Sequence, residues 1–240
     1  MIDTDRPRHC LVTGANRGLG LEFVRQLLAR GDRVLATCRQ PGRAQALNRL
    51  VAEHPGRLHV LPLDVASPKT HAELLRELPL VNGGASAPID LLVNNAGVLH
   101  AGERFGTVTA ENLDDSLRTN ASGPFLLTQA LAPQLADGAT VANLSSKLGS
   151  IASTERFGTP SYAISKAALN MATVLLAHAL ADRGIAVLAL HPGWVRTDMG
   201  GESAELEPAT AVADLLAVIG RAGRAQSGHL LDRHGAPLPW

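Results

Sequence analysis

Residues 13–20 read Thr13-Gly14-Ala15-Asn16-Arg17-Gly18-Leu19-Gly20 and directly follow the apolar run His9–Thr13. Glycines in this spacing allow a tight turn between a strand and a helix, and they let the main chain approach a bound group closely. The following helix would place its positive N-terminus at the turn, which suits an anion such as a pyrophosphate. The spacing G-x-x-x-G-x-G differs from the G-x-G-x-x-G dinucleotide fingerprint. On this motif alone, a glycine-rich turn without a ligand stays an alternative.

The rest of the chain repeats this alternation of strand and helix. Short apolar runs predict strands at His9–Thr13, Arg33–Cys38, Leu58–Leu63, Asp90–Asn94, Thr140–Leu144, Ala186–Leu190 and His229–Leu231. Helical spacing predicts helices at Leu19–Arg30, Ala44–Glu53, Lys69–Leu78, Glu111–Leu135 and Ser161–Asp182, and from Pro208 through Arg221. The sequence therefore predicts one α/β domain over residues 1–240, a doubly wound, Rossmann-type sheet of about seven mostly parallel strands with helices on both faces.

Composition narrows the class of protein. Hydrophobic residues make up 45% of the chain and charged residues 18%, which is enough apolar material for a large core. Lys plus Arg and Asp plus Glu each number 22, so no charge excess points to nucleic acid or to an anionic membrane. The stretch Met1–His9 has no apolar signal region, and no later run is long enough to span a bilayer. We expect a cytoplasmic protein.

The chemistry of the cysteines and histidines gives two further expectations. Cys10 opens the first predicted strand and Cys38 closes the second, so they would lie at opposite ends of neighbouring strands, about 13 Å apart at ~3.3 Å per residue. That is too far for a disulfide, and we expect two buried thiols. The nine histidines show no H-E-x-x-H motif or clustered ligands, so no metal site is expected.

The second predicted strand bears on cofactor choice. Many NAD-binding folds end it with an acidic residue that holds the ribose 2′-hydroxyl, whereas here it ends Ala36-Thr37-Cys38-Arg39. Arg39 and Arg17 could instead clamp a 2′-phosphate, or they could be solvated surface residues. The sequence favours NADP(H), with NAD(H) as the alternative.

Polar and small residues follow the third and fourth strands. Asp64, which ends the third strand before Val65, is placed either to accept from an adenine amino group or to lie as an exposed loop residue. After the fourth strand, Asn94-Asn95-Ala96-Gly97 offers two amides that can tie a turn together, while the small residues leave room for a cofactor.

The only tyrosine of the chain lies in Tyr162-Ala163-Ile164-Ser165-Lys166. Spacing of four residues puts Tyr162 and Lys166 on one helix face. A cation about 4 Å from the phenol is worth roughly 4 kcal/mol at an effective dielectric near 20, or about three pKa units. We therefore expect Lys166 to bring the pKa of Tyr162 down toward neutrality. The alternative is a half-buried tyrosine beside a lysine that serves no chemistry.

Two further motifs argue for chemistry. The fifth strand ends Asn143-Leu144-Ser145-Ser146, where a serine hydroxyl could donate to a substrate carbonyl. Asn120 is an unfavourable residue in the middle of a helix, so we expect a local kink or a bound water there.

In this order, the motifs resemble those of the short-chain dehydrogenase/reductase family over nearly the whole chain. The resemblance implies that Ser146, three residues before Gly149, polarises the carbonyl. It also implies that Tyr162 is the general acid, that Lys166 lowers its pKa and that Asn120 supports a proton-relay water. The implied cofactor-binding residues are Thr13, Gly14, Asn16, Arg17, Gly18, Leu19, Gly20, Arg39, Asp64, Val65, Asn94, Ala96, Gly97, Tyr162, Lys166, Pro192, Gly193, Val195 and Thr197.

More narrowly, Tyr162–Asn170 and His191–Gly201 resemble the C-factor and sniffer-like carbonyl reductase branch. This implies NADPH-dependent reduction of an aldehyde, ketone or quinone, and a homodimer or homotetramer. The alternatives are a cofactor-binding regulatory protein of C-factor type and a sugar-nucleotide epimerase, which usually has a larger C-terminal region. The segment 196–207 is either a substrate lid or a surface loop.

The apolar residues near the expected site are Leu99, Phe157, Trp194 and Met199. They either receive a hydrophobic substrate or belong to the core.

Overall fold

The carboxyl ends of seven parallel strands meet at one edge of a single sheet. The structure, a computed structural model, describes residues 7–81 and 87–240. The strands within these residues are ordered β3-β2-β1-β4-β5-β6-β7, and all neighbours pair in parallel. They are β1 (His9–Val12), β2 (Arg33–Cys38), β3 (Leu58–Pro62), β4 (Ile89–Asn94), β5 (Leu135–Leu144), β6 (Ala186–Leu190) and β7 (Leu230–Leu231).

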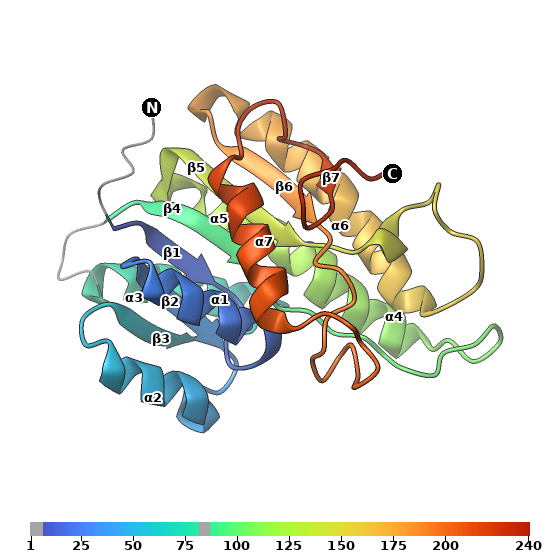
Figure 1. Ribbon diagram of the computed structural model, residues 1–240, viewed down its shortest axis with the longest axis horizontal. Helices are drawn as coiled ribbons and strands as arrows, with labels where there is room; N and C mark the ends of the chain where they lie inside the picture. The colour runs from blue at the N-terminus through green and yellow to red at the C-terminus, as the bar shows by residue number, and fades with distance from the viewer. Residues whose placement is uncertain (1–6, 82–86) are drawn as a thin grey trace.

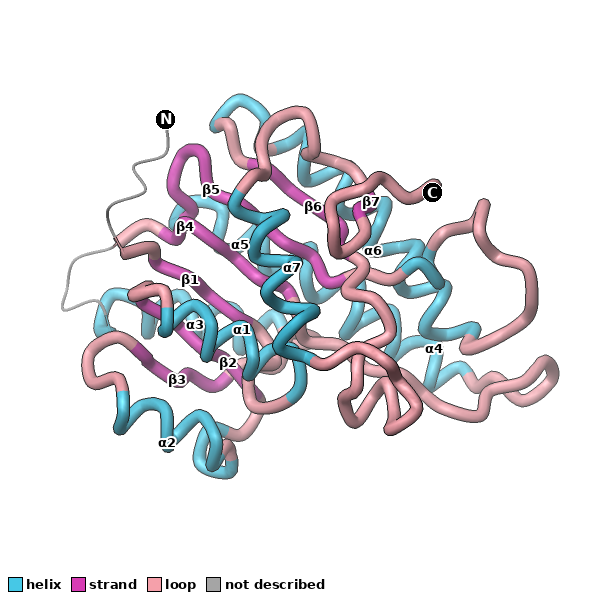
Figure 2. Tube along the Cα trace, viewed as in Figure 1, coloured by secondary structure: helices cyan, strands magenta, loops and turns pink. Residues whose placement is uncertain are grey.

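Helices cover both faces of the sheet (Figures 1 and 2). They are α1 (Gly18–Ala29), α2 (Gln45–Glu53), α3 (Pro68–Val81), α4 (Ala110–Leu117), α5 (Gly123–Leu131), α6 (Pro160–Ala179) and α7 (Pro208–Gly220). Apolar residues of α1, α2 and α7 pack on one face, and those of α3, α5 and α6 on the other. The doubly wound α/β sheet predicted from the sequence is confirmed.

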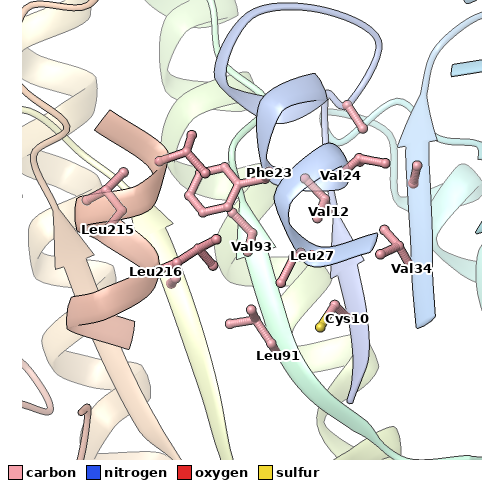
Figure 3. Packing of buried hydrophobic residues seen from close by; sticks show 14 of the residues in the cluster. Cys10, Val12, Phe23, Val24, Leu27, Val34, Leu91, Val93, Leu215 and Leu216 are labelled. Atoms are coloured by element: carbon pink, nitrogen blue, oxygen red, sulfur yellow. The ribbon is translucent and has the colours of Figure 1, made fainter. Parts of the chain in front are cut away.

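Strict alternation along the strands supplies both halves of the core. Cys10 and Val12 of β1 face α1, whereas Leu11 between them faces the opposite layer. Phe23 of α1 is fully buried and lies with Leu215 of α7 over the central strands (Figure 3). Truncating such a residue to alanine typically costs about 3–5 kcal/mol.

The order of the strands creates a switch point at the carboxyl edge of the sheet. The chain leaves β1 toward β2 on one side, and β4 lies against β1 on the other, so the connections after β1 and β4 diverge. Ligands of open parallel sheets bind at such a switch point, outside the carboxyl ends of the strands. In Figure 1 the long connections after β4 and β5 extend beyond this edge.

The helix predicted over Glu111–Leu135 is confirmed as a continuous helical run from Ala110 to Gln134, although it is not a regular α-helix throughout. The structure has α4, a π-helical turn at Arg118–Ser122, α5 and a 3-10 turn at Ala132–Gln134 before β5 begins. Pro133 within that turn lacks the N–H that a continuing helix requires. The first residues of β5 pair irregularly with β4, because the register shifts between Ile89 and Leu91. The kink expected at Asn120 is confirmed by the π turn.

Two smaller expectations concern the cysteines and the membrane. Cys10 and Cys38 are buried free thiols, as predicted, and burial raises the pKa of both. Among the described residues, no helix combines the length and the hydropathy needed to cross a membrane.

Candidate active site

The glycine loop between β1 and α1 is shaped by backbone conformation and by close contact. Gly14 and Gly18 have φ of +62° and +54°, which side chains disfavour. A Cβ at Gly14 would lie 2.8 Å from the Cα of Ala96, and one at Gly20 would collide with the carbonyl of Gly14. The loops after β1 and β4 therefore touch backbone to backbone, and the glycines are required sterically.

The loops after β1 and β4 are also hydrogen-bonded to each other. Thr13 Oγ1 accepts from the main-chain N–H groups of Asn95 and Ala96, each at 3.0 Å. Asn95 Nδ2 donates to the carbonyls of Thr13 and Gly14 at 2.8 and 3.1 Å. Asn95 was not among the predicted site residues, although the expectation that adjacent amides tie this turn together is confirmed for its side chain.

The side chain of Asn94 is hydrogen-bonded inside the protein. Its side chain is buried, and Nδ2 donates to Thr128 Oγ1 at 3.1 Å and to Asn143 Oδ1 at 2.8 Å. Alternation along β4 explains this direction, because Asn94 lies on the face of Leu92, toward α5. Only its main chain is left to border a ligand.

The N-terminus of α1 fits a pyrophosphate. Arg17 is the N-cap residue and makes no side-chain cap, and the first turn contains no acidic residue. The first N–H groups of a helix need an acceptor, and together with the helix dipole they attract an anion. Asn16 and Arg17 are exposed here, and Leu19 is half-buried. The uncapped helix end and the glycine cradle are the observations that fit a dinucleotide cofactor.

Arg39 and Asp64, which are expected to contact the adenosine part of a cofactor, follow β2 and β3 at the same edge of the sheet. Arg39 is exposed at the end of β2. Asp64 is half-buried, and its Oδ1 accepts from the N–H of Ala66 at 3.0 Å. The neighbouring Val65 is buried, and its carbonyl would collide with a side chain at Gly123.

Tyr162 and Lys166 lie together on α6, next to the end of β5. Their exposed fractions are 9% and 4%. Lys166 Nζ lies 5.4 Å from the centre of the Tyr162 ring and donates to the carbonyl of Leu144 at 2.7 Å. The ammonium is thus held between the phenol and the last residue of β5. The predicted pairing of the two side chains on one helix face is confirmed by this geometry.

The expectation that the pKa of Tyr162 falls toward neutrality is wrong for the protein alone. Burial raises the pKa of Tyr162 to about 12, while the Ser146 hydroxyl opposes the shift. Burial also lowers the pKa of Lys166 to about 8. Removing the phenol from water therefore outweighs the opposing effect of the Ser146 hydroxyl on the pKa. At neutral pH the phenol keeps its proton and the amine is mostly charged.

The two serines after β5 have different surroundings. Ser145 Oγ donates to Asn170 Oδ1 at 2.6 Å, so this hydroxyl is used in packing β5 against α6. Ser146 Oγ accepts from the N–H of Leu148 at 3.1 Å. Ser146 is also the serine whose hydroxyl lowers the pKa of Tyr162. A Cβ at Gly149 would lie 2.6 Å from the main chain of Lys166, so only glycine lets this turn approach α6.

Asn120 is fully buried in the π turn, and its side chain is occupied. Oδ1 accepts from the N–H of Val98 at 2.8 Å, and Nδ2 donates to the carbonyl of Val98 and to Ser165 Oγ, each at 2.9 Å. These bonds join the connection after β4 to α6. A Cβ at Gly97 would lie 3.1 Å from Asn120 Oδ1 and 3.8 Å from Lys166 Nζ, so the turn, the lysine and Gly97 meet at one place.

The segment after β6 folds over the glycine loop. Val195 forms a bridge with Leu206, and Trp194 Nε1 donates to the carbonyl of Gly200 at 2.8 Å. A side chain at Gly200 would collide with the carbonyl of Val195. The segment is therefore a closed, internally bonded loop.

The segment after β6 also contacts the glycine loop between β1 and α1. Arg17 Nη1 lies 2.8 Å from Asp198 Oδ2, with both side chains well exposed. Thr197 packs 3.5 Å from the position of a Cβ at Gly18. Gly193, with φ of +87°, allows the chain to turn after Pro192. Thr197 thus lies against the start of α1, and Pro192, Gly193 and Val195 precede it on the same segment.

Phe157, Trp194 and Met199 are 46–58% exposed, so these three side chains do not belong to the core, and Leu99 is half-buried.

The two histidines near this edge have different surroundings. His100 hydrogen-bonds Asp115 at 3.0 Å. His191 has a buried Nδ1 without a partner, and burial, reinforced by Lys147, lowers its pKa to about 4. In the described part of the chain, no group of three His, Cys, Asp or Glu residues could hold a metal ion.

The glycine loop, the Tyr162–Lys166 pair and Ser146 thus occupy one edge of a parallel sheet. The family model described as short chain dehydrogenase matches residues 8–208. The chain belongs to this family. The short-chain dehydrogenase superposes on the carbonyl reductase Sniffer of D. melanogaster with a TM-score of 0.92 and 33% identity, over 98% of this chain and 100% of that chain. The NADPH-bound carbonyl reductase from chicken fatty liver gives 0.91 and 36%, over 98% and 100%.

The chain is also similar in sequence to a protein whose name refers to signalling. "C-signal" of Myxococcus xanthus is 39% identical over 157 residues, which cover 65% of this short-chain dehydrogenase and 95% of that protein. Similarity to both carbonyl reductases and C-signal confirms the branch of the family indicated by the sequence motifs.

Proposed function

We propose that the protein reduces the carbonyl group of a small molecule with NADPH. The observation that carries this proposal is the buried Tyr162 beside the carboxyl end of β5. Its ring centre lies 5.4 Å from the buried Lys166 ammonium, and Ser146 lowers its pKa. Bound NADPH would supply the hydride, which forms the new bond to the carbonyl carbon. The other steps belong to side chains of this chain.

Tyr162 gives its proton to the carbonyl oxygen as the carbonyl π bond breaks. Because its pKa is about 12, the phenol is protonated at neutral pH, as a proton donor must be. The phenolate left behind is stabilised by the Lys166 ammonium, which lies 5.4 Å from the ring centre. Opposite charges about 5 Å apart attract by roughly 3 kcal/mol at an effective dielectric of 20. Ser146 would donate to the same carbonyl oxygen while charge develops on it.

Asn120 would take part through its main chain, because its side chain is already bonded within the protein. Its carbonyl belongs to the π turn beside Gly97 and Lys166, where a water could join the ammonium to solvent and return a proton to Tyr162. π turns interrupt the regular bonding of a helix and occur frequently at functional sites.

The cofactor would lie along the edge from Arg39 to Thr197. The pyrophosphate would meet the N–H groups at the start of α1, and Arg39 with Arg17 would receive the 2′-phosphate. Support for NADP(H) over NAD(H) comes from these arginines, from the absence of a carboxylate in Arg33–Cys38 and from the NADPH-bound relative. Asp64, Val65, Ala96 and Gly97 would border the adenosine, and Pro192, Gly193, Val195 and Thr197 the nicotinamide.

The segment 196–207 would act as the lid of this site. It lies against the glycine loop through the Arg17–Asp198 ion pair and carries Met199 on its exposed surface. With Phe157 and Trp194, Met199 offers an apolar rim to the substrate. A second copy of the chain could pair along α6, where Ile164, Met171 and Leu175 are about half exposed. Light scattering after size-exclusion chromatography should show a dimer or a tetramer. A monomer would count against this pairing.

The test is NADPH oxidation with a panel of aldehydes, ketones and quinones, with identification of the product. We expect an alcohol whose carbinol carbon carries deuterium placed at C4 of the cofactor, or, from a quinone, a hydroquinone without the label, because its hydroxyl hydrogens exchange with water. Similarity to C-signal supports a second candidate, a cofactor-binding regulatory protein. Tight NADPH binding without turnover across the whole panel would favour that candidate over the enzyme.

A further inference from the structure

Helix α6, which carries Tyr162, begins in an unusual way. Its N-cap residue, Thr159, has φ of 41° and ψ of 55° and makes no side-chain cap. Among the described residues, Thr159 is the only non-glycine residue with positive φ. A left-handed conformation is unfavourable for a β-branched residue, so the surrounding structure must impose this start on the chain.

A distant carboxylate supplies the missing cap. Glu103, in the connection between β4 and α4, accepts at Oε2 from both the N–H and the Oγ of Ser161, at 3.2 and 2.7 Å. Ser161 is fully buried and immediately precedes Tyr162. An anion is well placed at the positive end of a helix, and hydrogen bonds to ionised groups are strong. The first turn of α6 is therefore held from a segment 58 residues away.

The two segments also meet through aromatic rings. Phe105 and Phe157 stack edge to face, with 5.8 Å between ring centres and an interplanar angle of 85°. Phe105 is 89% exposed, so it is not placed there by burial in the core. The connection before α4 and the loop before α6 are thus joined at two points, one of them next to Tyr162.

This arrangement includes two unfavourable features. Besides the strained Thr159, the second oxygen of Glu103, Oε1, is buried without a hydrogen-bond partner. An unsatisfied buried polar atom destabilises the fold, and such local departures from stability are expected at functional sites. Glu103 is therefore better explained by what it positions than by the stability it adds.

We propose that Glu103 is a positioning residue, which fixes the first turn of α6 and thereby the Tyr162 phenol. The proposal rests on the proposed function for its kinetic consequences. If the carboxylate is lost, the first turn of α6 should loosen, and the phenol should sample positions from which it cannot reach a carbonyl oxygen.

The variants Glu103→Ala and Glu103→Gln test this, with Glu155→Ala as control, because Glu155 is exposed in the neighbouring loop. We expect Glu103→Ala to lower kcat tenfold or more with the KM for NADPH unchanged. Glu103→Gln should keep at least a third of the activity, because its amide oxygen can accept both bonds. Wild-type kcat in Glu103→Ala, or equal losses in both variants, would overturn the proposal. If Glu103→Ala does not fold, Ser161→Ala removes one of the two bonds and should give a partial loss of kcat; an unchanged kcat counts against the proposal.

A second readout needs neither cofactor nor substrate. Tyr162 is the only tyrosine, so phenolate absorbance near 295 nm reports on it alone. After a rapid jump to pH 11, wild type and Glu103→Gln should form phenolate only as they unfold, because burial raises the pKa of Tyr162 to about 12. Glu103→Ala should form a large part of it at once. Identical traces in all three proteins would refute the positioning role even if no carbonyl substrate is found.

Discussion

Replacing Lys166 by methionine should abolish turnover and, near neutral pH, remove a destabilising feature of the fold. The amine is 4% exposed, and burial lowers its pKa from 10.5 to about 8. This shift corresponds to roughly 3 kcal/mol of destabilisation below pH 8, at 1.36 kcal/mol per unit. The variant would also leave the Leu144 carbonyl without the donor that it now has, which costs about 1–3 kcal/mol. The pH dependence separates the two effects.

Between pH 8 and pH 10.5 the unfolded chain keeps the Lys166 proton that the folded protein has lost. Stability contributed by this residue therefore rises with pH in that window. The free energy of unfolding of wild type should gain about 2 kcal/mol relative to Lys166→Met between pH 7 and pH 9.5. The loss of the Leu144 hydrogen bond is the same at both pH values and cancels.

Urea unfolding followed by far-UV circular dichroism measures this difference. Lys69→Met is the matched control, because the Lys69 side chain is 84% exposed and should show no such dependence. A difference between wild type and Lys166→Met that stays constant within about 0.5 kcal/mol from pH 7 to pH 9.5 would refute the claim that the ammonium is desolvated.

Two further predictions concern residues on either side of the site. Ser146→Ala should lower kcat by a factor of about 10²–10³. Ser145→Ala should keep kcat and lose about 1 kcal/mol of stability, because it removes the hydrogen bond to Asn170. The reverse pattern in kinetics and urea unfolding would contradict the assignment of the serines. Asp198→Asn should release Arg17 for the 2′-phosphate and lower the KM for NADPH by up to about fivefold, as an exposed ion pair allows. The KM for NADH should not change, and an equal change for both cofactors would speak against competition for Arg17.

The sequence predicts the framework because its signals are local. Apolar runs of strand length, helical spacing and glycines after the first strand depend on neighbours a few residues away. The same holds for the spacing of four that puts Tyr162 and Lys166 on one face. Asn94 could also have been assigned to the buried layer, because alternation along β4 already places it on the face of Leu92.

Other features depend on contacts that no local pattern contains. The cap of α6 joins Glu103 to Ser161 across 58 residues, and it takes the place of the local cap that Thr159, in its left-handed conformation, does not make. The π turn within the helical run 110–134 and the early start of β5 at Leu135, which pairs with Ile89 of β4, are likewise not visible in the local pattern. The direction of the Tyr162 pKa shift depends on how deeply the phenol is buried, which the spacing of two residues does not determine.

The account depends most on Tyr162 as the proton donor. Tyr162→Phe removes only one oxygen from a buried ring. With NADPH and the best substrate of the panel, we expect kcat to fall by about 10²–10⁴, the range of general acid catalysis, while the Kd for NADPH changes less than about threefold. A phenylalanine variant that binds NADPH normally and keeps most of the wild-type kcat would contradict the account.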